Sequence, residues 1–450
     1  MTPQRKLFGT DGVRGEAGTF LSAELATALG RAAVASLEAE RPQVLIVRDT
    51  RESGPMLEAA LAAGIAAAGG EALLGGVLPT PAAAILVRRL GLDLAAVVSA
   101  SHNPYRDNGI KFFSREGTKL DDEAEARIES LLSERGGHSI RYADEMTTAP
   151  AAGPGRVREL NGGLEDYLRA LESAFPLDLS GVKVALDCAN GATHRAAPAI
   201  FERLGAEVEA IAAEPDGRNI NDGCGSTHLD NLAAHVAAAE ATIGFAFDGD
   251  GDRVLAVDAA GRAHDGDELI ALVATGMAAR GELEGGVAVT VMSNYGFHRA
   301  MAEAGIEVAT ARVGDRYVLD ELLGRGWALG GEQSGHIIDR RFVATGDGIA
   351  AALMTMRELA GRDLATAATM TKLPQTLLNV EVADREAVTG AAAVWEAVER
   401  ESAGLEGRGR VLLRPSGTEP LVRVMVEAPT AEEAEAVCGR LADVVRDELG

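Results

Sequence analysis

Short apolar segments alternate along the chain with longer segments that are amphipathic or rich in alanine. An apolar run at residues 44–47 is followed by an alanine-rich stretch up to residue 68, and another apolar run lies at residues 95–98. Short continuous apolar runs are typical of strands buried on both faces, and the longer stretches between them are predicted to be helices. The same order restarts at residues 182–186 and at residues 287–291. The other elements predicted by this pattern are helices up to residue 204, at 229–240 and at 297–304, and strands at 207–211, 242–247 and 306–309.

This alternation predicts an α/β fold with three similar α/β domains, whose mixed or parallel sheets are covered on both faces. The last eighty or so residues follow a different order and are predicted to form a separate C-terminal α+β domain. Candidate linkers lie at residues 147–155, which are rich in Ala, Pro and Gly, and near residues 372–374. The elements expected in the C-terminal domain are strands at 377–382, 411–413 and 422–426 and helices at 388–402 and 430–449.

The composition is acidic, since 43 Lys and Arg against 68 Asp and Glu among 450 residues give a net charge of −25. A nucleic-acid binder or a protein held on anionic lipid has the opposite balance, so we expect neither nucleic acid nor membrane as a partner. Cys188, Cys224 and Cys438 form no C-x-x-C pair, which argues against a thiolate zinc site. No apolar run reaches the ~18 residues of a membrane helix, and the first residues have no apolar core of a signal peptide. We therefore expect a soluble, cytoplasmic protein.

The first candidate site is the segment Ser-Ala-Ser-His-Asn-Pro at residues 99–104, which follows an expected buried strand. The ligand crevices of α/β sheets lie at such strand ends. Ser101 beside His102, with Lys111 further on, is consistent with an activated nucleophile and a proton donor, whereas a plain loop shaped by Asn and Pro is the alternative. Only five of the 43 basic residues are lysines. Because lysine can give up its proton when its surroundings lower its pKa and arginine cannot, Lys111 favours proton transfer.

The second candidate is the segment Phe-Asp-Gly-Asp-Gly-Asp-Arg, which ends at Arg253 and is the strongest local signal. Asp248, Asp250 and Asp252 alternate with glycines after an apolar strand, so an extended chain would turn all three carboxylates to one side. A cation between them would relieve their repulsion, and oxygen ligands favour Mg²⁺ or Ca²⁺ over zinc. An EF-hand is excluded, because Arg253 stands where that loop requires glycine and Ala259 where it requires glutamate. Three carboxylates do not complete the octahedral coordination of Mg²⁺, which favours a phosphate oxygen as a further ligand. The alternative interpretation of this segment is an acidic, solvated turn.

Two further segments are candidate ligand loops. Arg-Pro-Ser-Gly-Thr-Glu-Pro begins at Arg414 and is followed by Arg423, so hydroxyl groups, a glycine amide and two guanidiniums lie within ten residues, as in a phosphate clamp. Gly-Gly-Glu-Gln-Ser-Gly-His at residues 330–336 offers a carboxylate, an amide, a hydroxyl and an imidazole, which suits a ligand with several hydroxyl groups. The alternative for the segment at Arg414 is a turn between two strands, and the alternative for residues 330–336 is a plain loop. No P-loop and no dinucleotide-binding glycine motif occurs in the sequence, so no nucleotide site is expected.

Together the four segments resemble those of the α-D-phosphohexomutase family. The likeness covers nearly the whole chain, from Phe-Gly-Thr-Asp-Gly-Val-Arg-Gly at residues 8–15 to the loop at Arg414. The motif spellings are most similar to those of the bacterial phosphoglucosamine mutase branch, since the phosphomannomutase/phosphoglucomutase branch more often has Met where Gln333 stands. The resemblance implies four domains around a central cleft, each of which contributes one loop. Their expected bounds are 1–152 with the phosphoserine loop, 153–255 with the metal loop, 256–370 with the sugar-recognition loop and 371–450 with the phosphate clamp.

The resemblance also implies the chemistry of the site. Ser101 would be carried as phosphoserine, and its phosphate would hold Mg²⁺ together with Asp248, Asp250 and Asp252. Glucosamine 6-phosphate would become glucosamine 1-phosphate through a 1,6-bisphosphate, for UDP-N-acetylglucosamine synthesis, and a hexose 1,6-bisphosphate would be the activator. The residues expected to take part in proton transfer are His102, Lys111 and His336. The residues expected to bind substrate are Arg14, Arg253, Glu332, Ser334, Arg414, Ser416, Gly417, Thr418 and Arg423.

Three alternatives stay open on the sequence alone. A phosphomannomutase or phosphoglucomutase would use the same machinery on another sugar. An aspartyl-phosphate phosphatase also begins with Asp-x-Asp after an apolar strand, but that function would leave Ser101, His102 and the loop at Arg414 without roles. The third is a relative that binds sugar phosphate without turning it over. The sequence also leaves the oligomeric state open, a homodimer included.

Overall fold

The computed structural model describes residues 7–9, 11–135, 139–142, 153–416 and 419–450. The chain divides into two compact units. The first consists of Met1–Met292 and Ile306–Ala368, and the second of Ser293–Gly305 and Thr369–Gly450. Among the described residues, no helix has both the length and the apolar character that crossing a bilayer requires.

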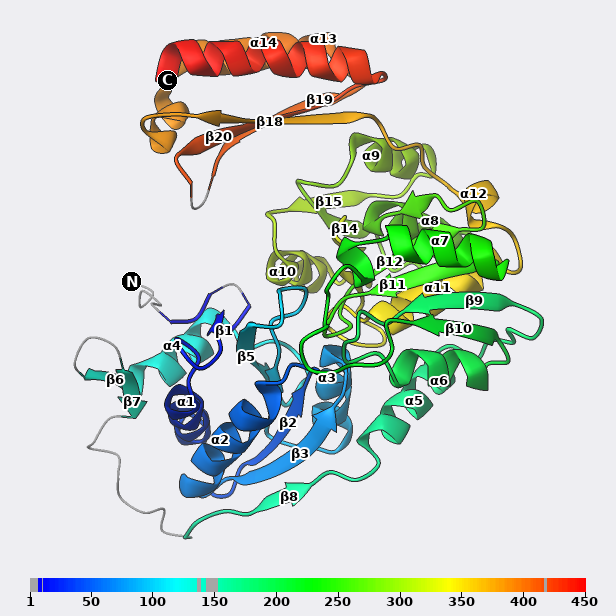
Figure 1. The fold of residues 1–450 in the computed structure, drawn as a ribbon. Coiled ribbons are helices and arrows are strands. Elements are labelled where there is room, and N and C mark those ends of the chain that lie inside the picture. The colour runs from blue at the N-terminus through cyan, green and yellow to red at the C-terminus, as the bar shows by residue number, and fades with distance from the viewer. Residues whose placement is uncertain (1–6, 10, 136–138, 143–152, 417–418) are drawn as a thin grey trace. The chain divides into compact units, whose positions relative to one another are not determined.

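The first unit begins with a six-stranded sheet. In sheet order, its strands are β1 (Val13–Glu16), β5 (Asp107–Ser114), β4 (Leu94–Val98), β2 (Gln43–Arg48), β3 (Glu71–Val77) and β8 (Val157–Glu159). The helices around it are α1 (Ala23–Ala35), α2 (Gly54–Ala67), α3 (Thr80–Arg89) and α4 (Asp122–Ser130), and a small ribbon pairs β6 (Leu132–Arg135) with β7 (Ser139–Tyr142). Helices α1 and α2 lie on one side of β2 and β3 and α3 on the other, as Figure 1 shows.

Two further sheets belong to the first unit. The second has the order β10 (Glu207–Ile211), β9 (Lys183–Asp187), β11 (Ile243–Phe247), β12 (Val254–Asp258) and β13 (Ala263–His264). The third has the order β15 (Val308–Ala311), β14 (Val287–Thr290), β16 (Leu329–Gly331) and β17 (Ile337–Asp339). The helices of this part are α5 (Gly163–Ala174), α6 (Ala196–Arg203), η2 (Gly225–Thr227, a 3₁₀ turn), α7 (Asp230–Ala239), α8 (Gly266–Ala279), α10 (Asp315–Arg325), α11 (Gly348–Leu359) and α12 (Leu364–Ala367).

The three sheets repeat one arrangement of four strands. In each, a first strand (β2, β9 or β14) is flanked by the next two strands of a group, both parallel to it. The fourth strand (β5, β12 or β17) then pairs antiparallel with the third. This repetition confirms the prediction of three similar α/β domains with mixed sheets.

Three loops join the third strand of each group to its antiparallel fourth strand. They comprise residues 99–106 between β4 and β5, residues 248–253 between β11 and β12, and residues 332–336 between β16 and β17. Each loop therefore lies at the carboxyl end of the parallel strands, which is the edge where α/β sheets bind ligands. Three of the four candidate segments of the sequence occupy these equivalent positions.

Glycines allow helices α1 and α2 to pack closely. A Cβ at Gly30 would lie 2.4 Å from the carbonyl oxygen of Leu61, and a Cβ at Gly64 would lie 2.1 Å from that of Thr27. No larger residue fits these positions without moving a backbone, so the two glycines fix the distance between the helices. Ser22 precedes helix α1 as its N-cap, and its side chain accepts a hydrogen bond from the backbone N–H of the third residue of the helix.

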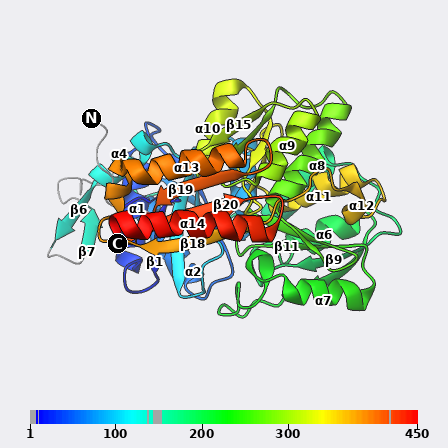
Figure 2. The same cartoon turned by 90° about the horizontal axis from the view of Figure 1, so that it is seen from above.

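The second unit has a three-stranded antiparallel sheet. In sheet order its strands are β18 (Gln375–Glu381), β20 (Leu421–Glu427) and β19 (Arg410–Pro415). Helices α13 (Ala392–Gly404) and α14 (Ala431–Leu449) lie side by side across this sheet, as Figure 2 shows. The 3₁₀ helix η3 (Arg385–Gly390) and helix α9 (Tyr295–Glu303) also belong to this unit. Buried apolar residues of the strands and of both long helices form a separate core, which confirms the predicted α+β domain.

The predicted elements differ from the structure in a few places. The strand expected at 306–309 is shifted to Val308–Ala311. The helix expected at 388–402 is two elements, because the extended backbone at Ala391 separates η3 from α13. The antiparallel strands β5, β12 and β17 were not predicted, since β5 mixes charged and apolar residues and β17 has three residues. The candidate linker at 147–155 lies largely outside the described residues.

Candidate active site

Ser101 lies opposite the aspartate loop. Its hydroxyl donates a hydrogen bond of 2.5 Å to Oδ2 of Asp248, and the residue is buried. Ser101 has a φ of 52°, in the left-handed region that residues with a Cβ rarely adopt. At Gly249, a Cβ would lie 2.6 Å from the carbonyl oxygen of Ser101, so glycine is needed where the two loops meet. The fold thus brings together two segments that are 147 residues apart.

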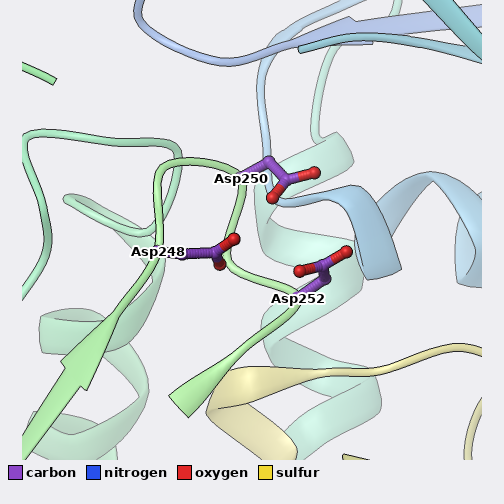
Figure 3. A group of neighbouring side chains, drawn as sticks. All are labelled: Asp248, Asp250 and Asp252. Carbon is purple, nitrogen blue, oxygen red and sulfur yellow. The ribbon is translucent and has the colours of Figure 1, made fainter. Parts of the chain in front are cut away.

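Asp248, Asp250 and Asp252 turn their carboxylates toward a common point, as Figure 3 shows. All three are buried, and one oxygen of each lies within 4.8 Å of the others. In the described part of the chain, Oδ1 of Asp250 and Oδ1 of Asp252 are buried and accept no hydrogen bond. Burial and the charges of Asp252 and Asp250 raise the pKa of Asp248 well above its ordinary value. A hard divalent cation would satisfy the free oxygens and remove the repulsion, so this donor set fits such an ion.

Lys111 lies on β5 and is buried beside the aspartates. Its Nζ donates to Oδ2 of Asp250 at 2.6 Å and lies 3.8 Å from Oδ2 of Asp252. Burial alone would lower the pKa of Lys111, but the carboxylates of Asp11, Asp250 and Asp252 outweigh it and raise that pKa. These neighbours keep Lys111 an ammonium, whereas the sequence argument for proton transfer relied on surroundings that lower the pKa of a lysine.

His102 directly follows Ser101 and is partly buried. Its Nδ1 lies 3.4 Å from the hydroxyl oxygen of Ser101. Burial and the positive charges of Arg253 and Arg14 lower the pKa of His102. The ring is therefore neutral near pH 7, and a neutral imidazole is the form that accepts a proton.

His336 is held by the loop that follows β17. Its Nε2 accepts a hydrogen bond of 2.9 Å from the backbone N–H of Gly346, and its Nδ1 lies 3.6 Å from Oδ2 of Asp252. A backbone N–H can only donate, so Nε2 carries no proton and the ring proton lies on Nδ1, toward Asp252. Since both nitrogens have neighbours in the protein, His336 is less available for substrate than His102.

Arg14 and Arg253 place guanidinium groups near these residues. Arg14 forms an ion pair with Asp11, and the backbone N–H of Arg253 donates to Oδ1 of Asp248 at 3.1 Å. The Nε of Arg253 lies 3.9 Å from Oδ1 of Asp252. Within the described residues, Nε of Arg14 and Nε of Arg253 are buried and have no hydrogen-bond acceptor. Buried, unsatisfied guanidinium donors are suited to an anionic ligand.

The loop between β16 and β17 contains the expected sugar-binding residues. Glu332 accepts a hydrogen bond of 3.0 Å from the backbone N–H of Gly314, and Ser334 is exposed. Gln333, by contrast, donates to Asp265, the N-cap of α8, at 3.2 Å. The amide of Gln333 thus supports the loop.

The sequence analysis missed Lys119, Asp11 and Asp315. The ammonium of Lys119 donates hydrogen bonds to Oδ1 of Asp11 and to Oδ2 of Asp315. Lys119, Asp315 and His336 also line a cavity of about 730 Å³ in the first unit. The rarity of lysine, which drew attention to Lys111, marks Lys119 equally, because two of the five lysines of the chain lie in this site.

The expected phosphate clamp lies in the second unit. Arg414 on β19 pairs directly with Arg423 on β20. The hydroxyl of Ser416 accepts from the backbone N–H of Glu419 at 3.3 Å, and Arg423 lies 3.5 Å from the carboxylate of Glu419. The two remaining expected residues, Gly417 and Thr418, lie outside the described residues.

Four family models match successive parts of the chain. They are the phosphoglucomutase/phosphomannomutase alpha/beta/alpha domain I at residues 5–136, domain II at 165–261 and domain III at 265–377, and the C-terminal domain at 377–444. The chain belongs to the phosphoglucomutase/phosphomannomutase family.

Known proteins similar to the chain agree with this assignment. A phosphoglucosamine mutase of Moorella thermoacetica is 50% identical over 442 residues, which cover 97% of this chain and 98% of that protein. The crystal structure of a phosphoglucomutase/phosphomannomutase family protein from Burkholderia thailandensis superposes with a TM-score of 0.79 at 25% identity, covering 98% of this chain and 97% of the other. N-acetylphosphoglucosamine mutase of Aspergillus fumigatus, solved with GlcNAc-6P and magnesium, has the same fold, with a TM-score of 0.68 at 19% identity over 100% of this chain and 97% of the other.

Proposed function

We propose that this chain is an isomerase that interconverts glucosamine 6-phosphate and glucosamine 1-phosphate. The observation that carries the proposal is the hydrogen bond of 2.5 Å between the hydroxyl of Ser101 and Asp248, a member of the cation-binding triad. The choice of the amino sugar is supported by 50% identity with a phosphoglucosamine mutase over nearly the full length of both chains.

The reaction is two phosphoryl transfers with Ser101 as the carrier. In the first, the bond between phosphorus and Oγ of phosphoserine 101 breaks and Oγ takes a proton from an acid, while a bond forms between phosphorus and the free hydroxyl of the sugar, which loses its proton to a base. The product is a 1,6-bisphosphate. After this intermediate turns around, the bond between its other phosphorus and the sugar oxygen breaks, the phosphoryl group bonds to Oγ of Ser101, which loses its proton to a base, and the sugar oxygen takes up a proton. The neutral imidazole of His102 and the ammonium of Lys111 are the proposed base and acid, and His336 orients Asp252.

Asp248, Asp250 and Asp252 would hold Mg²⁺ together with a phosphate oxygen on Ser101. When bound, the ion neutralises charge on the transferring phosphoryl group, which is the main catalytic requirement of this chemistry. The protein itself contributes the buried carboxylates and keeps Lys111 against Asp250. This site also explains why three carboxylates are kept in a buried position.

Substrate is proposed to bind through cations and loop hydroxyls. Arg14 and Arg253, whose buried Nε donors are unsatisfied among the described residues, would contact the reacting phosphate. Glu332 and Ser334 would bind ring hydroxyls. The residues of the second unit proposed to hold the other phosphate are Arg414, Ser416, Gly417, Thr418 and Arg423. A hexose 1,6-bisphosphate is the proposed activator, because it can phosphorylate Ser101 directly.

The remaining parts of the proposal concern organisation. We also propose that the chain has four domains, at 1–152, 153–255, 256–370 and 371–450, and that it is located in the cytoplasm. A homodimer is compatible with them.

A comparison of substrates tests the function. Purified protein is charged with glucose 1,6-bisphosphate and assayed with the 6-phosphates of glucosamine, glucose and mannose at equal concentrations. We expect the highest kcat/KM with glucosamine 6-phosphate and no release of inorganic phosphate. A clear preference for mannose 6-phosphate would show that the proposed substrate is wrong. Steady release of inorganic phosphate without isomerisation would show that the protein is a phosphatase.

A further inference from the structure

Arg51 is a fully buried arginine that binds the backbone of the loop carrying Ser101. Its Nη2 donates to the carbonyl oxygens of Ser101 at 2.9 Å and Asn103 at 2.8 Å. Its Nη1 donates to the carbonyl oxygens of Asp107 at 3.0 Å and Pro104. Its Nε donates to Oδ2 of Asp49 at 2.8 Å, so every donor group of the guanidinium is used.

Asp49 connects Arg51 to the other side of Ser101. The hydroxyl of Ser99 donates to Oδ2 of Asp49 at 2.6 Å and accepts from the backbone N–H of Ser101 at 3.0 Å. Both peptide groups that flank Ser101 are therefore bound to the Asp49–Arg51 pair, one through Ser99 and one directly. A φ of 52° at Ser101 is unfavourable for a serine and persists only where the surroundings hold it.

Asn221, which lies between β10 and η2, is a second donor to the same carbonyl. Nδ2 of Asn221 donates to the carbonyl oxygens of Ser101 at 2.9 Å and Asn103 at 3.1 Å. The carbonyl of Ser101 thus accepts hydrogen bonds from both Arg51 and Asn221. These contacts fix the loop to two segments far apart in the sequence.

We propose that Arg51, oriented by Asp49, is a positioning residue that holds the backbone of Ser101 so that its Oγ stays directed at Asp248. The inference rests on the proposed function in that Ser101 is taken as the phosphate carrier. Arg51 touches no reacting atom and acts through the carbonyls of the loop. Phosphoryl transfer depends on alignment of the donor and acceptor oxygens, and small displacements reduce the rate strongly.

Lysine cannot replace this arginine. It has the same charge, but its donors all lie on one nitrogen and cannot reach four carbonyls and a carboxylate in different directions. Arg51→Lys therefore keeps the charge beside Asp49 and loosens the loop. The matched control is Arg340→Lys, because Arg340 also binds two carbonyls, those of Leu322 at 2.9 Å and Trp327 at 2.6 Å, outside the site.

The experiment compares wild type, Arg51→Lys and Arg340→Lys. Steady-state kinetics with glucosamine 6-phosphate, single-turnover transfer from phosphorylated Ser101, and hydrogen exchange of peptides covering residues 100–108 are measured on folded protein. For Arg51→Lys we expect kcat and the transfer rate to fall at least tenfold, KM to stay within threefold, and the loop to exchange faster. Arg340→Lys is expected to match wild type in all three. A folded Arg51→Lys protein with kcat within twofold of wild type, or an equal loss in Arg340→Lys, overturns the proposal.

Asn221→Asp keeps the test decisive if Arg51→Lys does not fold. Aspartate tolerates the left-handed φ of 58° at this position, and its carboxylate cannot donate to the carbonyls of Ser101 and Asn103. Because Arg51 still binds both carbonyls in this variant, we expect kcat to fall by less than tenfold, whereas a larger loss with Arg51 in place would assign the positioning role to Asn221 and overturn the proposal. If wild type does not isomerise glucosamine 6-phosphate, the proposed function fails, whereas the exchange of the loop in the variants still decides whether Arg51 holds it.

Discussion

Lys119 provides a direct test of the electrostatics around the site. Its side chain is 10% exposed and forms ion pairs with Asp11 and Asp315, whose side chains are 22% and 17% exposed. The two partners lie 108 and 196 residues away in the sequence, so the pairs exist only in the folded chain. Lys119→Met keeps most of the apolar stem and removes the charge, which leaves two carboxylates without their shared cation.

The expected cost follows from these contacts. Removing one partner of a fully buried ion pair costs about 3–5 kcal/mol. Partial exposure of both carboxylates reduces this cost, because water screens them. Asp11 also keeps its ion pair with Arg14 and a distance of 3.9 Å to Nζ of Lys111. We therefore expect Lys119→Met to lower the free energy of unfolding by about 2 kcal/mol.

Urea unfolding of Lys119→Met, Asp315→Asn and the double variant measures this interaction. The double variant should be less destabilised than the sum of the single variants by at least about 1 kcal/mol, because with position 315 neutral the loss of Lys119 affects only Asp11, which keeps its ion pair with Arg14. Lys183→Met is the control, since Lys183 pairs with Glu207 and Glu209 at the surface and should change stability by less than about 0.5 kcal/mol. Additive single effects, or a Lys119→Met protein as stable as wild type, would refute the reasoning.

Three further outcomes follow from the structure. Burial lowers the pKa of His264, but hydrogen bonds to Glu268 and Asp258 outweigh it and raise that pKa. The charged form of His264 therefore stabilises the fold fully below the pKa of the unfolded state, and this stabilisation is lost as pH rises through the pKa of the folded state. The difference in Tm between wild type and His264→Gln should shrink from pH 6 to pH 9. A constant difference would contradict this. Burial raises the pKa of Asp347 to about 7, and Tyr167 donates to its carboxylate at 2.9 Å. Tyr167→Phe should therefore lower Tm more at pH 8 than at pH 5.5, and an equal loss at both would count against this interaction. Excess EDTA should stop turnover, and Mg²⁺ should restore it; turnover that persists in EDTA would remove the metal from the mechanism.

Much of the fold could be predicted because its central strands are continuous apolar runs. Ile243–Phe247, for example, is buried at every position, and its pattern predicts a strand without knowledge of its neighbours. The antiparallel strands β5 and β17 carry no such signal. In β5 the buried Lys111 is compatible with a strand interior only because Asp250 lies 2.6 Å away in the folded chain.

The candidate site could be predicted where its residues are grouped in the sequence. The aspartate triad and the Ser101 segment are both of this kind, and the fold brings them together. Arg51 and Lys119 were not predicted, because the partners of both lie far along the chain; for Lys119 the rarity of lysine was the one signal in the sequence. The carbonyl oxygens that Arg51 binds belong to the backbone, and no sequence pattern identifies them.

The most direct test of the proposed chemistry is the fate of phosphate on Ser101. Protein purified from cells is analysed by intact mass and phosphopeptide mapping, before and after incubation with glucosamine 6-phosphate, alongside Ser101→Ala and the control Ser36→Ala. We expect one phosphate on Ser101, its transfer to the sugar, and a loss of turnover by orders of magnitude in Ser101→Ala alone. Near-normal turnover in Ser101→Ala, or covalent phosphate on Asp248 instead, would contradict the proposal.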